Sequence, residues 1–366
     1  MRLFLAIALL VFGALNFITI FALLRLHPRR KTIVVALAIV CNLMWLFLPI
    51  LNARTGFSRL IRAVLGPPWF AWLCFVLVYP LFALLSYLAR SVWPSRIFLW
   101  ATLVAIPVGV YSALVPIDVE RVPVEVPNAP STRIAVIADL HTGLFTRPSR
   151  LRQIFATTAS LKPDVVLLAG DLIDDDPYFT PKLLAGMRDF PPNIPVLAVM
   201  GNHEMYGAPY EYIAKMRGGR ARLLVNEGMP LHGLWIAGLS DYAAGSPELR
   251  PNFDAALRGK PAGMIPIVVA HQPRAFPESI SRGIPLTLVA HTHGGQFGFR
   301  ALHWSLAGLF LPYHMGLYRR GASQLYVNTG TGFWLLPWRI GVLPEITLID
   351  LRSVSPHSAS MRNVAR

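Results

Sequence analysis

The sequence predicts four N-terminal transmembrane helices followed by an α/β domain, a layered β-sandwich flanked by helices. The chain of 366 residues is 54% hydrophobic and only 14% charged, which is unlike an ordinary soluble protein. All of its acidic side chains lie after residue 117, where short β-rich runs begin to alternate with amphipathic stretches. The first 117 residues therefore differ in kind from the rest of the chain.

Four uninterrupted apolar runs lie in the first 117 residues, each close to the ~20 residues with which a helix crosses a bilayer. They are Leu3–Leu24, Ile33–Leu51, Trp69–Leu88 and Ile97–Ile117. The first run is too long for the apolar core of a signal peptide and lacks a clear small-x-small cleavage site before Arg25. We therefore expect it to be retained, and residues 1–117 to form a four-helix transmembrane region.

Basic residues in the loops between these runs predict the orientation. Arg2 precedes the first run, and four basic residues follow it, which are Arg25, Arg29, Arg30 and Lys31. Counted over all loops, the basic residues are tied between the two sides, but the first helix usually dominates. We therefore expect a multi-pass protein of the plasma or inner membrane, with its C-terminal domain on the extracytoplasmic side.

The positive charge of the chain is mainly a feature of the apolar region. The formal net charge is +15, and ten of the basic residues lie among the first 117 residues, which have no acidic ones. A nucleic-acid partner would require a basic stretch with interleaved aromatic residues in the C-terminal part. That part has a small net charge and no such stretch, so a nucleic-acid partner is not expected. The bilayer is the expected partner of the N-terminal part.

The pattern of the remaining chain predicts one large α/β domain over residues 133–351. Prolines in residues 118–132 indicate an extended linker, and residues 352–366 read as a basic flexible tail. Helices are expected near Ser149–Ser160 and Pro181–Arg188. The expected strands are Ile134–Ala138, Val165–Ala169, Val196–Met200, Leu234–Leu239, Ile265–Ala270, Leu286–Ala290, Leu325–Asn328 and Ile346–Leu351.

Polar residues follow several of these expected strands. They are Asp139 and His141, Asp171, Asn202 with His203 and Glu204, His271, and finally His291 and His293. One such residue alone would be read as a turn residue or a helix cap. Together they predict a site, because strand ends in open α/β sheets meet at one edge. Oxygen and imidazole donors without a thiolate suit Mn, Fe, Zn or Co, and their number suits two ions rather than one.

The order of these blocks resembles the calcineurin-like metallophosphoesterase superfamily: Asp-x-His, Gly-Asp, Gly-Asn-His-(Asp/Glu), a lone His, then His-x-His. The runs His291–Gln296 and Pro344–Ile346 are similar to a membrane-associated subgroup with N-terminal transmembrane helices. The resemblance implies metal ligands and one catalytic residue. It assigns Asp139, His141 and His293 to a first ion, Asn202, His271 and His291 to a second, Asp171 as a bridge to both, and His203 to the leaving oxygen.

Two positions depart from the pattern of the superfamily. Ala290 stands where a glycine usually precedes the first histidine of the last block, which could crowd a tight backbone approach. Glu204 stands where many members have Asp, so a carboxylate is kept with one extra methylene. Neither change removes an expected ligand.

The expected function is a membrane-anchored dimetal phosphohydrolase that cleaves a phosphate ester or pyrophosphate by attack of a metal-bridging hydroxide. Its substrate is expected to be a phosphorylated lipid or small molecule of the cell envelope. The alternatives are a metal-dependent nuclease or nucleotide phosphodiesterase, and a non-enzymatic membrane module with an inert domain.

Two further features remain open from the sequence. The stretches Phe297–Tyr318 and Phe333–Trp338 are unusually apolar, and with Arg300 and Arg339 beside them they fit either core packing or a lipid-binding surface. The acidic run Asp174–Asp176 is expected to be a solvated loop, with a further metal site as the alternative.

Overall fold

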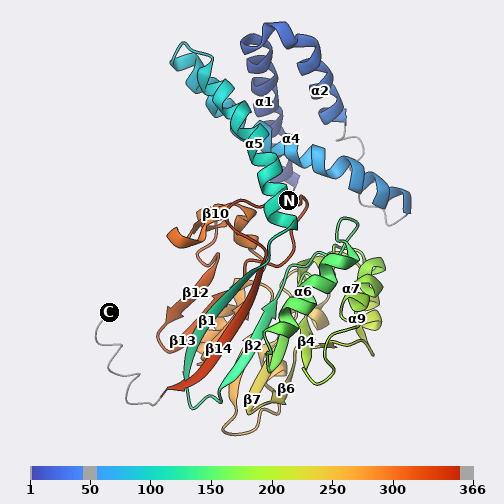
Figure 1. The fold of residues 1–366 in the computed structure, drawn as a ribbon, viewed down its shortest axis with the longest axis vertical. Coiled ribbons are helices and arrows are strands. Elements are labelled where there is room, and N and C mark those ends of the chain that lie inside the picture. The colour runs from blue at the N-terminus through green and yellow to red at the C-terminus, as the bar shows by residue number, and fades with distance from the viewer. Residues whose placement is uncertain (1, 44–55, 355–366) are drawn as a thin grey trace. The chain divides into compact units, whose positions relative to one another are not determined.

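The computed structural model describes residues 2–43 and 56–354 and divides the chain into two compact units, Met1–Gly109 and Val110–Arg366. The first unit is helical (Figure 1). Its elements, of which α5 ends in the second unit, are α1 (Arg2–Leu26), the 3₁₀ turn η1 (Pro28–Arg30), α2 (Lys31–Leu43), α4 (Gly56–Leu88) and α5 (Trp93–Leu114).

A sharp bend separates the first two helices. The segments Leu10–Leu26 and Pro28–Leu43 meet at 107°. Pro28 has no backbone N–H and restricts the residue before it, so His27 leaves the helical conformation, with φ −129° and ψ 59°. The first two apolar runs therefore form a bent pair, which is either one broken span or a re-entrant loop.

The prediction of four transmembrane helices is wrong for the part of the chain that the structure describes. There, α5 alone is long and apolar enough to cross a membrane, and the bent pair could make a second span. The third run lies within α4, of which only the shorter stretch Cys74–Leu88 counts as an apolar helix among the described residues. Residues 44–51 of the second run lie outside the described residues. Apolar composition over a run does not ensure one straight helix of sufficient length.

The second unit contains two six-stranded sheets, with orders β1-β14-β2-β3-β4-β5 and β12-β13-β9-β8-β7-β6. The first sheet comprises β1 (Asp118–Pro127), β14 (Glu345–Val354), β2 (Thr132–Ile137), β3 (Val165–Ala169), β4 (Val196–Val199) and β5 (Arg222–Leu223). The second comprises β12 (Gly316–Arg320), β13 (Ser323–Val327), β9 (Leu286–Val289), β8 (Ile265–Val269), β7 (Leu234–Gly238) and β6 (Glu227–Leu231). A small hairpin is formed by β10 (Gly298–Phe299) and β11 (Trp304–Ser305).

Short helices cover the sheets and connect their strands. The α-helices are α6 (Pro148–Ser160), α7 (Thr180–Gly186), α8 (Asn202–Tyr206), α9 (Pro209–Met216), α10 (Phe253–Leu257) and α11 (Phe276–Ser281). The 3₁₀ turns are η3 (Pro177–Phe179), η4 (Pro247–Leu249), η5 (Pro273–Ala275), η6 (His293–Gln296), η7 (Arg300–Leu302) and η8 (Leu306–Leu309).

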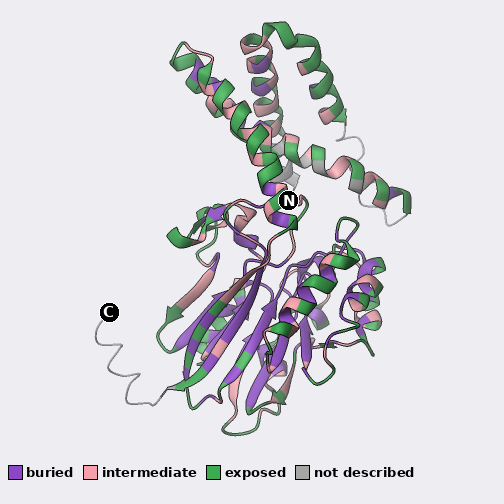
Figure 2. Cartoon of the chain, viewed as in Figure 1, coloured by how far each residue is buried: buried purple, intermediate pink, exposed green. Residues whose placement is uncertain are grey.

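The alternation of side chains along each strand builds the layers of this unit. Val136 of β2 and Ile236 of β7 belong to one buried apolar cluster that joins the two sheets. Their neighbours Ala135 and Ala237 point to the opposite faces, into clusters shared with α6, α7 and α9 and with α10 and α11. Figure 2 shows the strands as mostly buried. The expected α/β domain is confirmed, and all the expected strands and both helices are present.

The residues expected to form a linker instead begin the domain. Residues 118–127 form β1, which pairs in parallel with β14 over its whole length. Val122, Val124 and Val126 are buried, and the residues between them are exposed. Pro123 and Pro130 suggested a linker, but proline is compatible with an edge strand, and β1, which contains Pro123, lies at the edge. At the other end β14 includes residues 352–354, and the rest of the expected tail lies outside the described residues.

Candidate metal centre

The predicted ligands follow strand ends in both sheets. Asp139 and His141 follow β2, Asp171 follows β3 and Asn202 follows β4, and these three strands are parallel. In the other sheet His271 follows β8, while His291 and His293 follow the parallel strand β9. Sheet topology thus brings together side chains that are far apart in the sequence.

Most of the predicted ligands have a left-handed backbone conformation. Their positive φ angles are 51° at Asp139, 42° at His141, 51° at Asp171, 74° at His291 and 50° at His293. Residues other than glycine rarely adopt this region, and such residues cluster at functional sites. Ala290 has no positive φ angle, so this position does not require glycine. Its backbone N–H donates to His271 O, directly after the strand.

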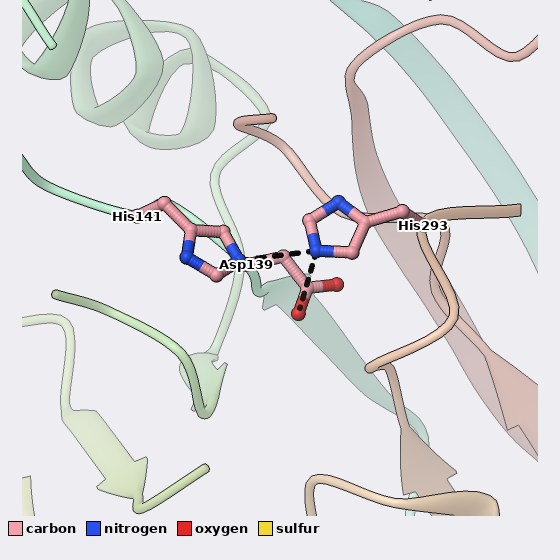
Figure 3. Close-up of side chains that lie close together, drawn as sticks. All are labelled: Asp139, His141 and His293. Atoms are coloured by element: carbon pink, nitrogen blue, oxygen red, sulfur yellow. Dashed lines mark hydrogen bonds and ion pairs between the residues drawn. The ribbon is translucent and has the colours of Figure 1, made fainter. Parts of the chain in front are cut away.

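Asp139, His141 and His293 form the first cluster, drawn in Figure 3. His141 Nε2 lies 3.1 Å from His293 Nε2, and His293 Nε2 lies 3.7 Å from Asp139 Oδ1. All three side chains are buried, and they offer ligand atoms within 4.8 Å of one another. This spacing could hold one ion.

Asp171, His271 and His291 form the second cluster. His271 Nε2 lies 3.1 Å from Asp171 Oδ2 and 3.2 Å from His291 Nδ1. His271 Nδ1 lies 2.8 Å from the Ala169 carbonyl, which can only accept, so we assign the proton to Nδ1. The lone pair of Nε2 then faces the cluster, as in histidines that bind metals.

Asp171 lies between the two clusters. Its Oδ2 is 3.8 Å from His141 Nε2 as well as 3.1 Å from His271 Nε2. Its Oδ1 accepts a hydrogen bond from the backbone N–H of His203, 2.9 Å away. This position is compatible with a carboxylate shared by two ions.

Several buried oxygens of the site have no hydrogen-bond partner among the described residues. They are both carboxylate oxygens of Asp139 and the side-chain oxygen of Asn202, which begins α8 beside His203. Buried polar atoms without partners are costly, and a bound cation removes that cost. Burial raises the pKa of Asp139 to about 7, so a neighbouring cation would also favour its ionised form. The donor set therefore fits divalent metal ions.

Three of the four histidines in the clusters are available as neutral ligands. Burial lowers the pKa of His141 and His293 well below the usual value, and each is further lowered by neighbouring histidines. Burial and the charge of His271 lower the pKa of His291 to about 4. Metal ions bind the deprotonated imidazole, so these shifts favour binding at neutral pH. In the fourth, His271, burial lowers the pKa but the charge and hydrogen bond of Asp171 raise it more, well above the usual value, and a cation bound beside Asp171 would offset this effect.

Glu204 holds the backbone around Asp171. Its carboxylate accepts four backbone hydrogen bonds, from Asp171, Leu172, Ile173 and Gly201, at 2.6 to 3.0 Å. A Cβ at position 201 would lie 2.2 Å from Asp171 Oδ1, so only glycine allows this approach. The glutamate therefore connects the ends of β3 and β4.

His203 faces the acidic loop after Asp171. Its Nδ1 forms an ion pair with Asp175 Oδ1 at 2.7 Å, and Asp174 Oδ1 lies 3.9 Å away. Burial lowers the pKa of His203, but the bond to Asp175 and the charge of Asp171 raise it more, to about 9. The interpretation of this acidic run as merely solvated is therefore wrong for Asp175. His203 also lies within ligand distance of His141 and Asp171.

The sequence left Arg339 between core packing and a possible lipid surface, and the structure supports core packing for this residue. The structure buries this side chain completely, with Nη2 3.2 Å from Nδ1 of the predicted ligand His293. Burial lowers the pKa of Arg339 to about 10, so it remains a cation at neutral pH. The only signal was a basic residue in an apolar run, which does not distinguish a buried cation from an exposed one.

An exposed apolar segment follows the last pair of predicted ligands. It consists of Phe299, Leu302, Trp304, Leu306, Leu309, Phe310 and Leu311, and Phe310 is 80% exposed. Exposed residues in the loops around β10 are visible in Figure 2. The segment adjoins the ligand turn, because a Cβ on Gly295 would lie 2.5 Å from Ala307 N. This arrangement argues against core packing as the whole explanation for the apolar sequence.

A second exposed aromatic group lies beside His203. The ring of Trp334 is 40% exposed and its centroid is 6.5 Å from that of His203. Gln296 connects Trp334 to the ligand turn, since its side chain accepts from Trp334 N at 2.8 Å and donates to Trp334 O at 3.2 Å. The predicted site is thus bordered by apolar surface.

Two stacked sheets with carboxylate, amide and imidazole donors at their strand ends define an α/β domain with a candidate metal site. The calcineurin-like phosphoesterase family model matches residues 132–295. The chain therefore contains a calcineurin-like metallophosphoesterase domain, as the order of its motifs implied.

Relatives with this domain occur in bacteria and animals. An uncharacterized metallophosphoesterase of Helicobacter pylori strain J99 is 30% identical over 60% of this chain and 59% of its own length. A transmembrane protein with metallophosphoesterase domain from Danio rerio is 30% identical over 67% of this chain and 59% of its own. The chain thus spans less than two thirds of the length of either relative. A dimetal phosphatase structure from Danio rerio is 13% identical with a TM-score of 0.38, over 55% of this chain and 88% of that one.

Proposed function

We propose that this chain hydrolyses a phosphate ester or pyrophosphate on a lipid or envelope-associated molecule, using two divalent ions of Mn, Fe, Zn or Co. The observation that carries the proposal is the convergence of two ligand clusters on Asp171, with His203 beside them. Oxygen and imidazole donors in this number suit a two-metal site.

Each predicted ligand has a proposed place in this site. Asp139, His141 and His293 would hold one ion, Asn202, His271 and His291 the other, and Asp171 both. When bound, the two ions would supply a water of lowered pKa and polarise the phosphoryl oxygens. The contribution of the protein is to fix the donors and to exclude other orientations of the phosphate.

His203 is the proposed catalytic residue. Its raised pKa of about 9 keeps the imidazole protonated at neutral pH, and its ion pair with Asp175 fixes the ring. In this form it can donate a proton to the oxygen that leaves phosphorus. Such proton transfer contributes about 10²- to 10⁴-fold in rate.

The apolar surface beside the centre supports an amphiphilic substrate. Leu309 and Phe310 are 61% and 80% exposed, and they lie on η8 and next to it, in contact with the turn that carries His293. An acyl chain on this surface would leave the phosphate at the ligand clusters. Burying apolar area would then contribute to binding in proportion to chain length.

We further propose that α5 anchors the chain in a membrane. This helix has a mean hydropathy of 2.0, and a relative bears the name of a transmembrane protein. Arg90 and Arg96 lie at the start of α5, and Arg121 is the nearest basic residue after it. The excess of basic residues before α5 favours a cytoplasmic start and an extracytoplasmic phosphoesterase domain.

Hydrolysis of a matched ester series tests the substrate proposal. The full chain, purified in detergent and supplied with Mn²⁺, should cleave ethyl and octyl esters of an aryl phosphate, and chelation should abolish turnover. The octyl ester should be preferred by at least about tenfold in kcat/KM, since each buried methylene contributes ~0.8 kcal/mol. Phe310→Ser should reduce this preference and leave cleavage of the ethyl ester unchanged.

The other outcomes select the alternatives. Equal rates for both esters would overturn the lipid substrate, and preferential cleavage of dinucleotides or single-stranded DNA would favour a nuclease. A folded chain that binds two ions and cleaves neither esters nor pyrophosphates would be an inert module.

A further inference from the structure

Arg339 is a buried cation in contact with the first ligand cluster. It lies in the irregular segment 328–344, which connects β13 to β14 and also carries Trp334. Its side chain is fully buried, although isolated charges are costly to bury. A guanidinium in this position needs several partners, and the identity of those partners indicates what the residue does.

The partners of Arg339 come from both the 328–344 segment and the ligand turn. Its Nε donates to Gly332 O at 2.9 Å, and Nη1 donates to Thr329 O at 3.0 Å, with Val342 O at 3.4 Å. Toward the ligand turn, Nη1 donates to His293 O at 3.5 Å. Nη2 also lies 3.2 Å from His293 Nδ1, but a guanidinium only donates, and an imidazole that binds metal through Nε2 carries its proton on Nδ1, so this second contact is packing and not a hydrogen bond. One side chain therefore joins the two ends of its own segment to a single predicted ligand.

Arg339 also lies next to the carboxylate of that cluster. A Cβ built on Gly330 would be 2.8 Å from Asp139 Oδ2 and 3.0 Å from Arg339 Nη2. The carboxylate and the guanidinium therefore lie on the same side of Gly330, close to each other. Gly330 has φ +82° and leaves this space open. The guanidinium is therefore close to two of the three donors of the first cluster.

We propose that Arg339 is a positioning residue of the first metal site, which fixes His293 and ties the 328–344 segment to it. This inference rests on the proposed two-metal function. Lysine cannot replace arginine here, because a single ammonium group cannot reach Gly332, Thr329 and His293 together, whereas the planar fork does. Loss of such supporting contacts typically weakens metal binding by about 10- to 100-fold.

Arg300 provides a matched control. It is another largely buried arginine near the same segment, hydrogen-bonded to Thr329 Oγ1 at 3.1 Å and paired with Glu345. Within the described part of the chain its contacts include none of the predicted ligands. Arg300→Lys and Arg339→Lys thus make the same chemical change beside the same loop, and only the second should affect the metal site.

Mn²⁺ titration of the full chain in detergent tests this role without measuring turnover. Arg339→Lys should weaken one of the two Mn²⁺ sites by about 10- to 100-fold and lose the spin-coupled two-ion EPR signal, as His293→Ala should. Arg300→Lys should bind both ions like the wild type. A folded Arg339→Lys chain with wild-type affinity at both sites, or equal loss in Arg300→Lys, would overturn the proposal.

Hydrogen exchange in the wild-type chain gives a second measurement that does not depend on whether Arg339→Lys folds. If Arg339 ties the segment to His293, Mn²⁺ should slow amide exchange in residues 328–344, and His293→Ala should abolish this effect. Unchanged exchange in a wild-type chain that has bound both ions would contradict the proposal. Two bound ions without hydrolysis would instead count against the proposed function.

Discussion

The two ligand clusters are supported by different parts of the fold. In the second cluster, His271 is oriented by a hydrogen bond to Ala169 O, which belongs to the central strand β3. In the first, His293 is contacted by Arg339 from an irregular segment that also carries the exposed Trp334. Strand register therefore fixes one cluster, whereas the geometry of the other depends on a connecting segment. We expect the first cluster to be the easier one to disturb.

Removing Asp171 should have the largest effect, because this carboxylate serves both clusters and its loss should empty both. Its carboxylate lies 3.1 Å from His271 and 3.8 Å from His141, so Asp171→Ala should lose both ions. Turnover should fall below detection, together with metal content measured by elemental analysis. Retention of one tightly bound ion would show that Asp171 serves only one cluster.

His203→Ala should separate catalysis from metal binding. The imidazole is paired with Asp175 and is the proposed proton donor, so kcat should fall by about 10²- to 10⁴-fold while both ions remain bound. Rates and metal content should be measured on the same samples. An empty site in this variant would mean that His203 is a ligand, a role that its distance from His141 and Asp171 also permits.

Glu204→Gln should affect the clusters through the backbone. The carboxylate now accepts hydrogen bonds from four backbone N–H groups. In Glu204→Gln the side-chain NH₂ group would replace one accepting oxygen and would face some of these donors. Leaving a buried donor unpaired costs about 1–3 kcal/mol, so the domain should unfold at a lower temperature and bind metal more weakly. Glu204→Asp is the comparison, since it keeps the charge but shortens the reach. A wild-type unfolding temperature for Glu204→Gln would contradict this role.

Asp175→Asn should have the smallest effect, a shift in pH dependence. The proton-donating form of His203 exists below its pKa, so the rate should fall as pH rises through that value, which Asp175 helps to raise to about 9. Removing this charge lowers the pKa, and the alkaline limb should move to lower pH by about one unit. A pH–rate profile with an unmoved alkaline limb would show that Asp175 does not act on His203.

The positions of eight strands along the chain and the convergence of the donors could be predicted, because both follow from local patterns. Apolar runs such as Val165–Ala169 end in a glycine and an aspartate, and parallel strands bring such ends to one edge. Arg339 could not be placed, because its partners are mostly backbone carbonyls, which leave no trace in residue identity. The pairing of Asp175 with His203 could not be predicted either, because it depends on the fold of a loop that connects distant strand ends.

The N-terminal part was harder to predict for a different reason. Apolar composition identified the helices and the loop between the first two, but not their geometry. Leu10–Leu26 and Pro28–Leu43 meet at 107°, so they could form one broken span where two separate spans were expected. Similarly, Pro123 and Pro130 favoured a linker over β1, although Val122, Val124 and Val126 alternate with other residues as in a strand. A proline in the sequence indicates a change in backbone geometry, but it does not predict whether that change is a bend, a loop or an edge strand.

The most direct test of hydrolysis at a two-metal site measures the turnover rate as a function of the number of ions bound to each chain. Metal-free full-length chain should be titrated with Mn²⁺ while an aryl phosphate ester is turned over and bound Mn²⁺ is counted. We expect little turnover with one ion bound and a steep rise as the second binds, with no rise in Asp171→Ala. Full activity with a single ion, or no turnover with both bound, would contradict this prediction.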